Sequence, residues 1–128
     1  MSFVRRHAAE VYAVMRIVVG FLFVCHGATK IFGWPGMPHE GTPEAIRWIA
    51  GIVELLGGAL VMVGAAVRPA AFVSSGLMAF AYWLAHGTQA VLPINNNGEL
   101  AAVYCFVFLF LAAHGAGVWS VDGPDGAD

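Results

Sequence analysis

The amino-acid sequence predicts an all-α protein, an integral membrane four-helix bundle in which residues 1–128 form a single domain. The chain is 59% hydrophobic and only 11% charged, whereas about a quarter of the residues in an ordinary soluble domain are charged. Between the few charges run apolar stretches of roughly 20 residues, the length of a helix that crosses a bilayer. So small a charged fraction cannot cover the surface of a soluble fold, and a membrane protein is the expected class.

The first two predicted helices cover residues 12–32 and 44–67. Glycine and proline cluster at 33–36 and end the first helix, because proline cannot continue a helix and both residues favour turns. The sequence Thr-Pro-Glu at 42–44 is typical of a helix start with proline in the first turn. Arg68–Pro69 is expected to end the second helix.

The third and fourth predicted helices cover residues 70–90 and 99–119. Leu92–Pro93 ends the third helix, and the polar sequence Asn95–Gly98 is typical of a turn. Most of the tryptophans fall near a predicted helix end, as in the aromatic belts of membrane interfaces; they are Trp34, Trp48, Trp83 and Trp119.

The basic residues predict how the helices are oriented. If four helices alternate in direction, Lys30 and Arg47 lie at the edges of one membrane side, and the side that holds both termini carries Arg5, Arg6, Arg16 and Arg68. Basic residues gather on the cytoplasmic side of membrane proteins. We therefore expect a multi-pass protein of the bacterial inner (cytoplasmic) membrane with both termini in the cytoplasm. The loops 33–44 and 91–98 would face the periplasm or the cell exterior.

Charge and cysteine content argue against two classes of function. The net charge is -2 and the arginines are scattered, so nucleic acid is not an expected partner. Cys25 and Cys105 lie inside apolar runs and form no Cys-x-x-Cys motif. We expect neither a metal site nor a redox pair from them, but two small buried hydrophobic side chains.

Glycines recur at a spacing of seven residues inside the predicted helices. The pairs are Gly20 with Gly27, Gly51 with Gly58, and Gly57 with Gly64. Seven residues are close to two helical turns, so each pair lies on one face of its helix. Stripes of small residues let helices pack backbone to backbone in lipid.

The first predicted helix carries cations inside the apolar region. An ionisable side chain in hydrocarbon costs about 3 kcal/mol even on lenient insertion scales, so these residues need an explanation. Arg16 and Lys30 lie near the two ends of one helix face, and Gly20, Phe23 and Gly27 lie between them on that face.

Polar side chains also line the third predicted helix, where Ser75, Tyr82, His86 and Gln89 fall within a narrow arc at 100° per residue. The second helix contributes one carboxylate, Glu54, with glycines on nearly the same face. We expect these polar stripes to face the interior of the bundle.

Depth in the membrane follows from the helical rise of about 1.5 Å per residue. Counted from the outer helix ends, His26 and His86 lie roughly 9 Å and 8 Å deep, Glu54 roughly 12 Å, and Lys30 roughly 3 Å. These four groups therefore share the outer leaflet, and Glu99 lies at its mouth.

This outer-leaflet cluster has two interpretations. In the structural one, Lys30 and Glu54 form an ion pair and the histidines donate to backbone carbonyls. In the other, the cluster is a pocket for a ligand with an apolar body and a carbonyl or hydroxyl head, which describes a quinone or a lipid. The head group then contacts His26, Lys30, Glu54, Tyr82 and His86, and a histidine exchanges a proton near neutral pH.

The remaining polar residues and other cofactors also have more than one interpretation. A haem held between His26 and His86 is a rival, although two helical histidines are a weak signal and no haem-attachment motif is present. No covalently bound cofactor is expected. Arg16, Asn97 and Glu99 are assigned structural polar roles.

Four short motifs occur in order along nearly the whole chain. They are Arg16 with His26-Gly27-Ala28-Thr29-Lys30, then Glu54-Leu55-Leu56-Gly57-Gly58, then Gly64 and Arg68 followed by His86, and last Asn97-Gly98-Glu99 with the ending Gly115 to Asp122. In this combination the chain resembles the DoxX family of small four-helix membrane proteins. One departure is Val118, which stands where an arginine or lysine is common.

The resemblance implies the four-helix membrane fold and a direction for the function. DoxX relatives are linked to quinone-coupled sulfur oxidation or to thiol-stress complexes. Our first hypothesis is a subunit of a membrane oxidoreductase or respiratory-type complex that contacts quinone or lipid, because the chain is too small to house a redox centre of its own. The second hypothesis is a non-catalytic accessory subunit that packs against a larger membrane complex through its glycine faces.

Overall fold

The computed structural model describes residues 1–37 and 41–124, and within these ranges the chain forms helices and turns without any strand. This confirms the all-α class. The elements in chain order are α1 (Ser2–Arg6), α2 (Ala8–Phe32), α3 (Glu44–Val63), α4 (Val67–Ala81), the π-helical turn η1 (Tyr82–Gly87), α5 (Pro93–Asn96) and α6 (Glu99–His114).

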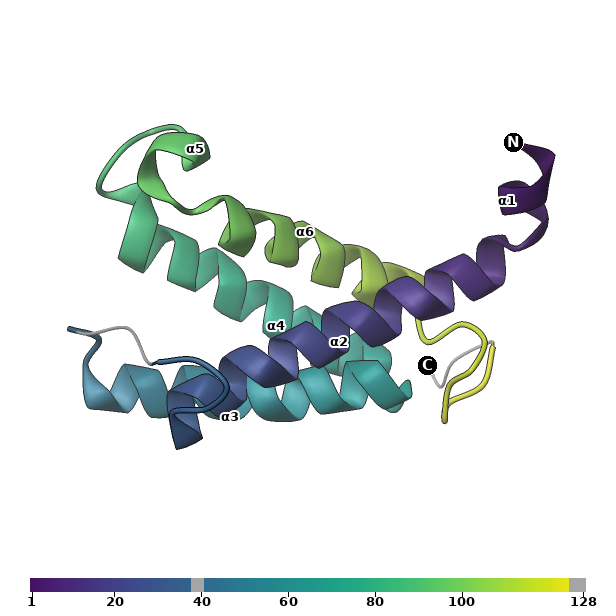
Figure 1. The fold of residues 1–128 in the computed structure, drawn as a ribbon, viewed down its shortest axis with the longest axis horizontal. Helices are drawn as coiled ribbons and strands as arrows, with labels where there is room; N and C mark the ends of the chain where they lie inside the picture. The colour runs from purple at the N-terminus through teal and green to yellow at the C-terminus, as the bar shows by residue number, and fades with distance from the viewer. Residues whose placement is uncertain (38–40, 125–128) are drawn as a thin grey trace.

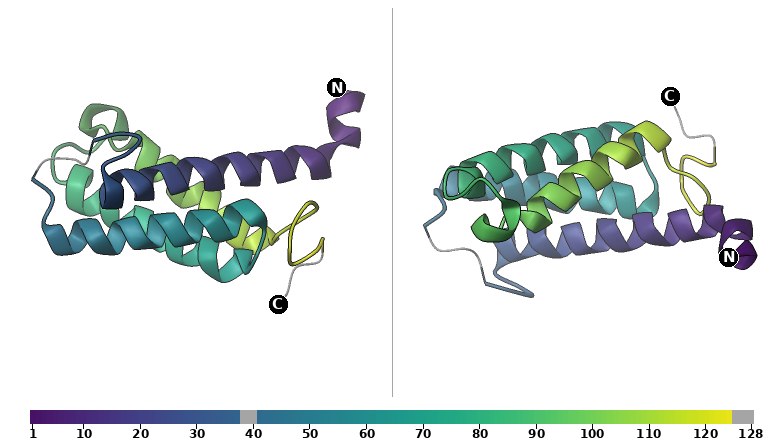
Figure 2. Two further views of the ribbon diagram at one scale, coloured as in Figure 1. Left: turned by 60° about the horizontal axis from the view of Figure 1, so that its bottom comes forward. Right: turned by 90° about the horizontal axis from the view of Figure 1, so that it is seen from above.

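The long helices form two packed pairs that lie against each other. Helix α2 packs mainly on α3, α4 packs mainly on α6, and contacts between α3 and α4 connect the pairs (Figure 1). The start of the chain and the C-terminal segment up to residue 124 lie at one end of the molecule, and the end of α2 and the short helix α5 lie at the other end (Figure 2). The chain therefore crosses the length of the molecule an even number of times.

Two of these helices are long and apolar enough to cross a membrane, namely α2 with 25 residues and α3 with 20. Helix α6 is apolar but has 16 residues. Helix α4 runs directly into η1, so the chain from Val67 to Gly87 is one continuous helical segment of about 30 Å at the usual rise per residue.

The second predicted helix ends earlier than expected, and Arg68–Pro69 does not break it. Helix α3 ends at Val63 because Gly64 adopts a left-handed conformation with φ of 76°, and its N–H donates to the carbonyl of Leu60 at 2.9 Å. Arg68 and Pro69 instead lie in the first turn of α4, where the missing N–H of proline costs no helical hydrogen bond.

The other predicted boundaries are also shifted. Helix α2 begins at Ala8 rather than at residue 12, and the third helical segment ends at Gly87 rather than at 90. The last helix ends at His114 rather than at 119, because Gly115 and Gly117 adopt positive φ angles of 95° and 69° and turn the chain back on itself.

Glycines bring α2 and α3 into backbone contact. A Cβ atom built on Gly20 would lie 2.7 Å from the carbonyl oxygen of Gly58, and one built on Gly27 would lie 2.7 Å from the carbonyl oxygen of Gly51. No real Cβ approaches an oxygen so closely, so the two helices meet where only glycine fits. The predicted glycine faces are confirmed for Gly20 with Gly27 and for Gly51 with Gly58, which pack against each other inside the chain. The pair Gly57 and Gly64 is not such a face, because Gly57 faces Ser74 of α4 and Gly64 lies beyond the end of α3.

Aromatic rings fill the space between α2 and α6. The ring of Phe23 lies 4.5 Å from that of Phe108 and 5.5 Å from that of Tyr104, measured between centroids. Phe23 and Phe108 are fully buried and Tyr104 is 7% exposed. Together with the glycine contact, these rings place the predicted inward face of α2 in the core, since Arg16, Gly20, Phe23 and Gly27 are buried.

The glycine contact predicts a strong difference between two glycine-to-alanine changes. Gly27→Ala forces α2 and α3 apart, and overpacking of this kind costs about 1–3 kcal/mol. The matched control is Gly76→Ala, because a Cβ on Gly76 in α4 meets nothing within 4 Å. Thermal unfolding of the purified protein in detergent should show a lower Tm for the first variant and an equal or higher Tm for the second. Equal Tm values for both variants would contradict the close contact.

Candidate functional site

Lys30 and Glu54 form a buried ion pair between α2 and α3. The Nζ atom of Lys30 lies 2.7 Å from Oε1 and 2.6 Å from Oε2 of Glu54. The carboxylate side chain is 4% exposed and the lysine side chain 27%. The interaction predicted between these residues is confirmed, and it depends on the glycines that hold the two helices together.

His26 lies on the same face of α2 as Lys30, one turn before it. Its ring meets the ring of Tyr104 edge-on, with centroids 5.9 Å apart and an interplanar angle of 87°. Tyr104 of α6 also packs on Phe23 and Phe108 in the core, with ring centroids 5.5 Å and 5.8 Å away. His26 therefore lies on the same face of α2 as Lys30 and against the aromatic core.

Tyr82 and His86 gather around Asn96 near the loop end of α4. The Nδ2 group of Asn96 donates to the hydroxyl oxygen of Tyr82 at 3.2 Å and to the carbonyl of Ala90 at 2.9 Å. Nδ1 of His86 lies 2.8 Å from the backbone carbonyl oxygen of Asn96, and the Asn96 side-chain oxygen accepts the N–H of Gly98 at 2.8 Å. Asn96 thus ties η1, α5 and the start of α6 together.

Gln89 does not continue the predicted inward stripe of the third helix. The π-helical turn η1 widens the backbone after Ala81 and changes the register of the side chains beyond it. The helix ends at Gly87, so Gln89 is exposed, and its side-chain amide donates to the carbonyl of Ala85 at 2.7 Å.

Asn97 and Glu99 are exposed near the same end of the molecule. Asn97 adopts a left-handed conformation with φ of 56° and ends α5, a position that asparagine tolerates better than most residues. Glu99 is the first residue of α6, where a negative charge is favourable next to the helix N-terminus.

An open hollow of about 310 Å³ lies beside His26. Its lining comes from one helix and the loop after it, namely Leu22, Cys25, His26 and Thr29 of α2 with Pro35 and Gly36. The loop is held against the helix because the N–H of Gly36 donates to Oγ1 of Thr29 at 3.3 Å. Of the predicted site residues, His26 is the one that reaches this hollow.

The roles of two residues at this end of the molecule were not predicted from the sequence. Asn96 is 1% exposed and carries four hydrogen bonds, but three consecutive asparagines gave no sign of which one is buried. Tyr104 lies in an apolar helix without polar periodicity, so its place beside His26 follows from packing alone. Over residues 1–37 and 41–124, no group of three His, Cys, Asp or Glu side chains is placed to hold a metal ion.

Comparison with known proteins identifies the family. The family model for DoxX matches residues 11–87, which include the Lys30–Glu54 pair, His26 and His86. The chain belongs to the DoxX family. No solved structure shows a significant match to this DoxX protein.

Two curated proteins are similar to this DoxX protein. An uncharacterized protein of Haemophilus influenzae is 34% identical over 130 residues, which cover 95% of this chain and 96% of that protein. The protein named putative oxidoreductase CatD from Bacillus subtilis is 32% identical over 59 residues, which cover 43% of this chain and 44% of that protein.

Arg16 has a structural role at the end of the DoxX fold that holds the termini. It is fully buried, and Nη1 donates to the carbonyls of Val61 at 2.7 Å and Met62 at 2.8 Å in the last turn of α3. Nη2 donates to the carbonyls of Trp119 at 2.7 Å and Val118 at 3.3 Å. A positive charge is favourable next to the C-terminal carbonyls of a helix. Arg16 thereby connects the end of α3 to the C-terminal segment of the chain.

Arg68 and Asp122 complete that end. Nη1 of Arg68 donates to the carbonyls of Ala113 at 2.8 Å and Ala112 at 3.3 Å, at the C-terminus of α6. Asp122 accepts the N–H of Val67 at 3.3 Å with Oδ2, at the N-terminus of α4. Arg16 contacts residue 118 through its backbone carbonyl. This contact therefore does not depend on whether the side chain at position 118 is valine or a cation.

The ion pair predicts coupled effects on stability. Lys30→Met or Glu54→Gln alone removes one charge of the pair. Loss of one partner of a fully buried pair typically costs about 3–5 kcal/mol, and we expect a smaller cost here because the lysine side chain is 27% exposed. The double variant should recover part of that loss. Thermal unfolding in detergent of the four proteins gives the coupling, with the exposed Glu44→Gln as control. Strictly additive losses would contradict a direct interaction.

Proposed function

We propose that this DoxX protein is a membrane subunit of an oxidoreductase assembly and that it binds the carbonyl head of a quinone beside His26. The observation that carries the proposal is the buried Lys30–Glu54 pair with His26 on the same face of α2. Ionisable groups within an apolar helix pair are costly, and in membrane proteins they commonly mark ligand or proton pathways.

The charges of the site favour a neutral head group over an anionic one. Both carboxylate oxygens of Glu54 lie within 2.7 Å of the Lys30 ammonium, which compensates its charge. A phosphate head would have to compete with Glu54 for that cation. A quinone carbonyl needs a hydrogen-bond donor, and an imidazole such as that of His26 can supply one.

One of the similar proteins supports an oxidoreductase as the kind of assembly. A relative that shares 32% identity over 43% of this chain is named a putative oxidoreductase. In the proposed complex the DoxX subunit provides the quinone head-group contact, and a partner subunit carries the redox centre that exchanges electrons with the quinone.

A non-catalytic accessory role is the alternative, and the structure changes how it would work. The glycine faces proposed for contact with a larger complex are used between α2 and α3. A partner would instead cover the exposed aromatic side chains of α4 and η1, namely Phe72, Phe80 and Trp83. Lipid tails cover such side chains equally well, so this surface does not favour the accessory role.

For the topology, we extend the two candidate spans to four. The spans are α2, α3, the segment from α4 through η1, and α6, and both termini face the cytoplasm across the inner membrane. The common end of the two termini supports an even number of crossings (Figure 1). The exposed Arg5 and Arg6 at that end support the cytoplasmic side.

The topology predicts the side on which two probes are found. A reporter enzyme fused after Asp128 should be active in the cytoplasm, and a cysteine replacing the exposed Thr42 should react with a membrane-impermeant maleimide added outside. A cysteine replacing the exposed Arg6 is the control and should react only after the membrane is opened. The reverse labelling pattern would place the His26 site in the cytoplasmic leaflet.

The proposed function predicts quinone binding that depends on the ion pair and His26. Isothermal titration calorimetry of the protein in lipid nanodiscs with a decyl-substituted benzoquinone should give at least tenfold weaker binding for His26→Gln and for the folded Lys30→Met/Glu54→Gln double variant. The histidine control is His114→Gln, because His114 is exposed and its ring contacts that of Tyr12 at the opposite end, with centroids 4.2 Å apart. Unchanged affinity in the first two variants would exclude this site.

A further inference from the structure

Apart from His26, the residues that line the hollow are not used by the head-group site described above. We propose that the hollow binds the hydrocarbon chain of the same quinone, so that the ligand enters sideways from the bilayer and its head turns inward past His26. This inference rests on the proposed function, because it adds a second part of the binding site to the first.

The position of the hollow points to lipid as the route of entry. Four of its lining residues belong to α2, which is long and apolar enough to cross a membrane. Leu22 at its edge is 45% exposed, and the neighbouring Phe21 is 54% exposed. In the proposed topology these exposed apolar side chains face hydrocarbon, so the hollow opens into the bilayer rather than into water.

The lining suits a chain better than a polar head. Leu22, Cys25 and Pro35 are apolar, and the hydroxyl oxygen of Thr29 already accepts the N–H of Gly36. A carbonyl or phosphate placed here would find few donors other than His26. A hydrocarbon chain needs none.

Size and connection agree with the same occupant. A volume of about 310 Å³ is at the lower end for a complete ligand site. A hollow of this size suits part of a ligand, such as a short stretch of a prenyl or alkyl chain, rather than a whole quinone. His26 borders the hollow and lies on the same face of α2 as Lys30, one turn before it, so the chain and the head would occupy adjoining places.

The chain contact should contribute specificity more than affinity. A chain that moves from the bilayer into the hollow leaves one apolar environment for another, so the hydrophobic effect adds little. What remains is van der Waals contact with a surface of fitting shape. We therefore expect a several-fold effect on binding rather than one of many orders of magnitude.

The test compares two quinones in two matched variants. Leu22→Trp narrows the hollow, and Phe21→Trp adds an exposed tryptophan at the neighbouring position of α2 outside it. Each protein, in nanodiscs, is titrated with a decyl-substituted benzoquinone and with its methyl-substituted counterpart, and affinities are expressed per mole fraction of quinone in the lipid. Cys25→Leu also narrows the hollow and provides a second test if Leu22→Trp does not fold.

Leu22→Trp and Cys25→Leu should weaken binding of the decyl quinone at least fivefold and leave the methyl quinone unchanged, whereas Phe21→Trp should change neither. Equal weakening of both quinones, or no weakening of either, would overturn the chain site while leaving the head-group site in place. If the unsubstituted protein binds neither quinone, the chain site and the proposed function both fail.

Discussion

The glycine contact between α2 and α3 is the constraint on which the rest of the structure depends. Because the backbones meet at Gly20 with Gly58 and at Gly27 with Gly51, the side chain of Lys30 reaches the carboxylate of Glu54 across a short gap. In lipid the hydrophobic effect does not hold helices together, so close van der Waals contact and polar interactions must do so. The small residues and the ion pair are thus two parts of one interface.

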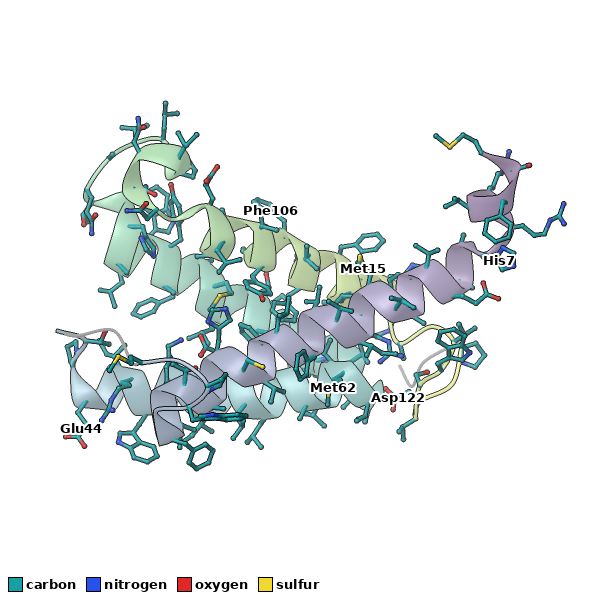
Figure 3. The ribbon with its side chains drawn as sticks, in the orientation of Figure 1. His7, Met15, Glu44, Met62, Phe106 and Asp122 are labelled. Carbon is teal, nitrogen blue, oxygen red and sulfur yellow. The ribbon has the colours of Figure 1, made fainter. Side chains whose placement is uncertain are left out.

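The two ends of the molecule, marked by Asp122 and by Glu44 in Figure 3, compensate cations in different ways. Near the start of the chain, Arg16 donates to four backbone carbonyls, two of them in the last turn of α3, where the helix end supplies negative charge. At the other end Lys30 is paired with a carboxylate. The first arrangement is rigid, because the carbonyls in the last turn of α3 cannot move away from Arg16 unless that turn unwinds. The second consists of two side chains, which a ligand can rearrange, and chemistry is more readily placed there.

Much of the site was predictable because it lies on helical faces. The buried face of α2 and the opposition of Lys30 to Glu54 follow from residue spacing and from the cost of charge in hydrocarbon. Tyr82 and His86 were predicted to join that cluster, but their partner is Asn96, since a π-helical turn changes the register and α5 folds over it. A pattern of 100° per residue cannot anticipate such a turn.

From the sequence alone came the all-helical class, the DoxX family and the charged pair, because periodicity and local motifs encode them. Tertiary structure alone decided how the chain closes at the termini, where Arg16 reaches the carbonyl of Trp119 across 103 residues. It also decided which asparagine is buried and that a hollow adjoins His26. Backbone carbonyls are the same at every residue, so the sequence carries no mark of those that a distant side chain will meet.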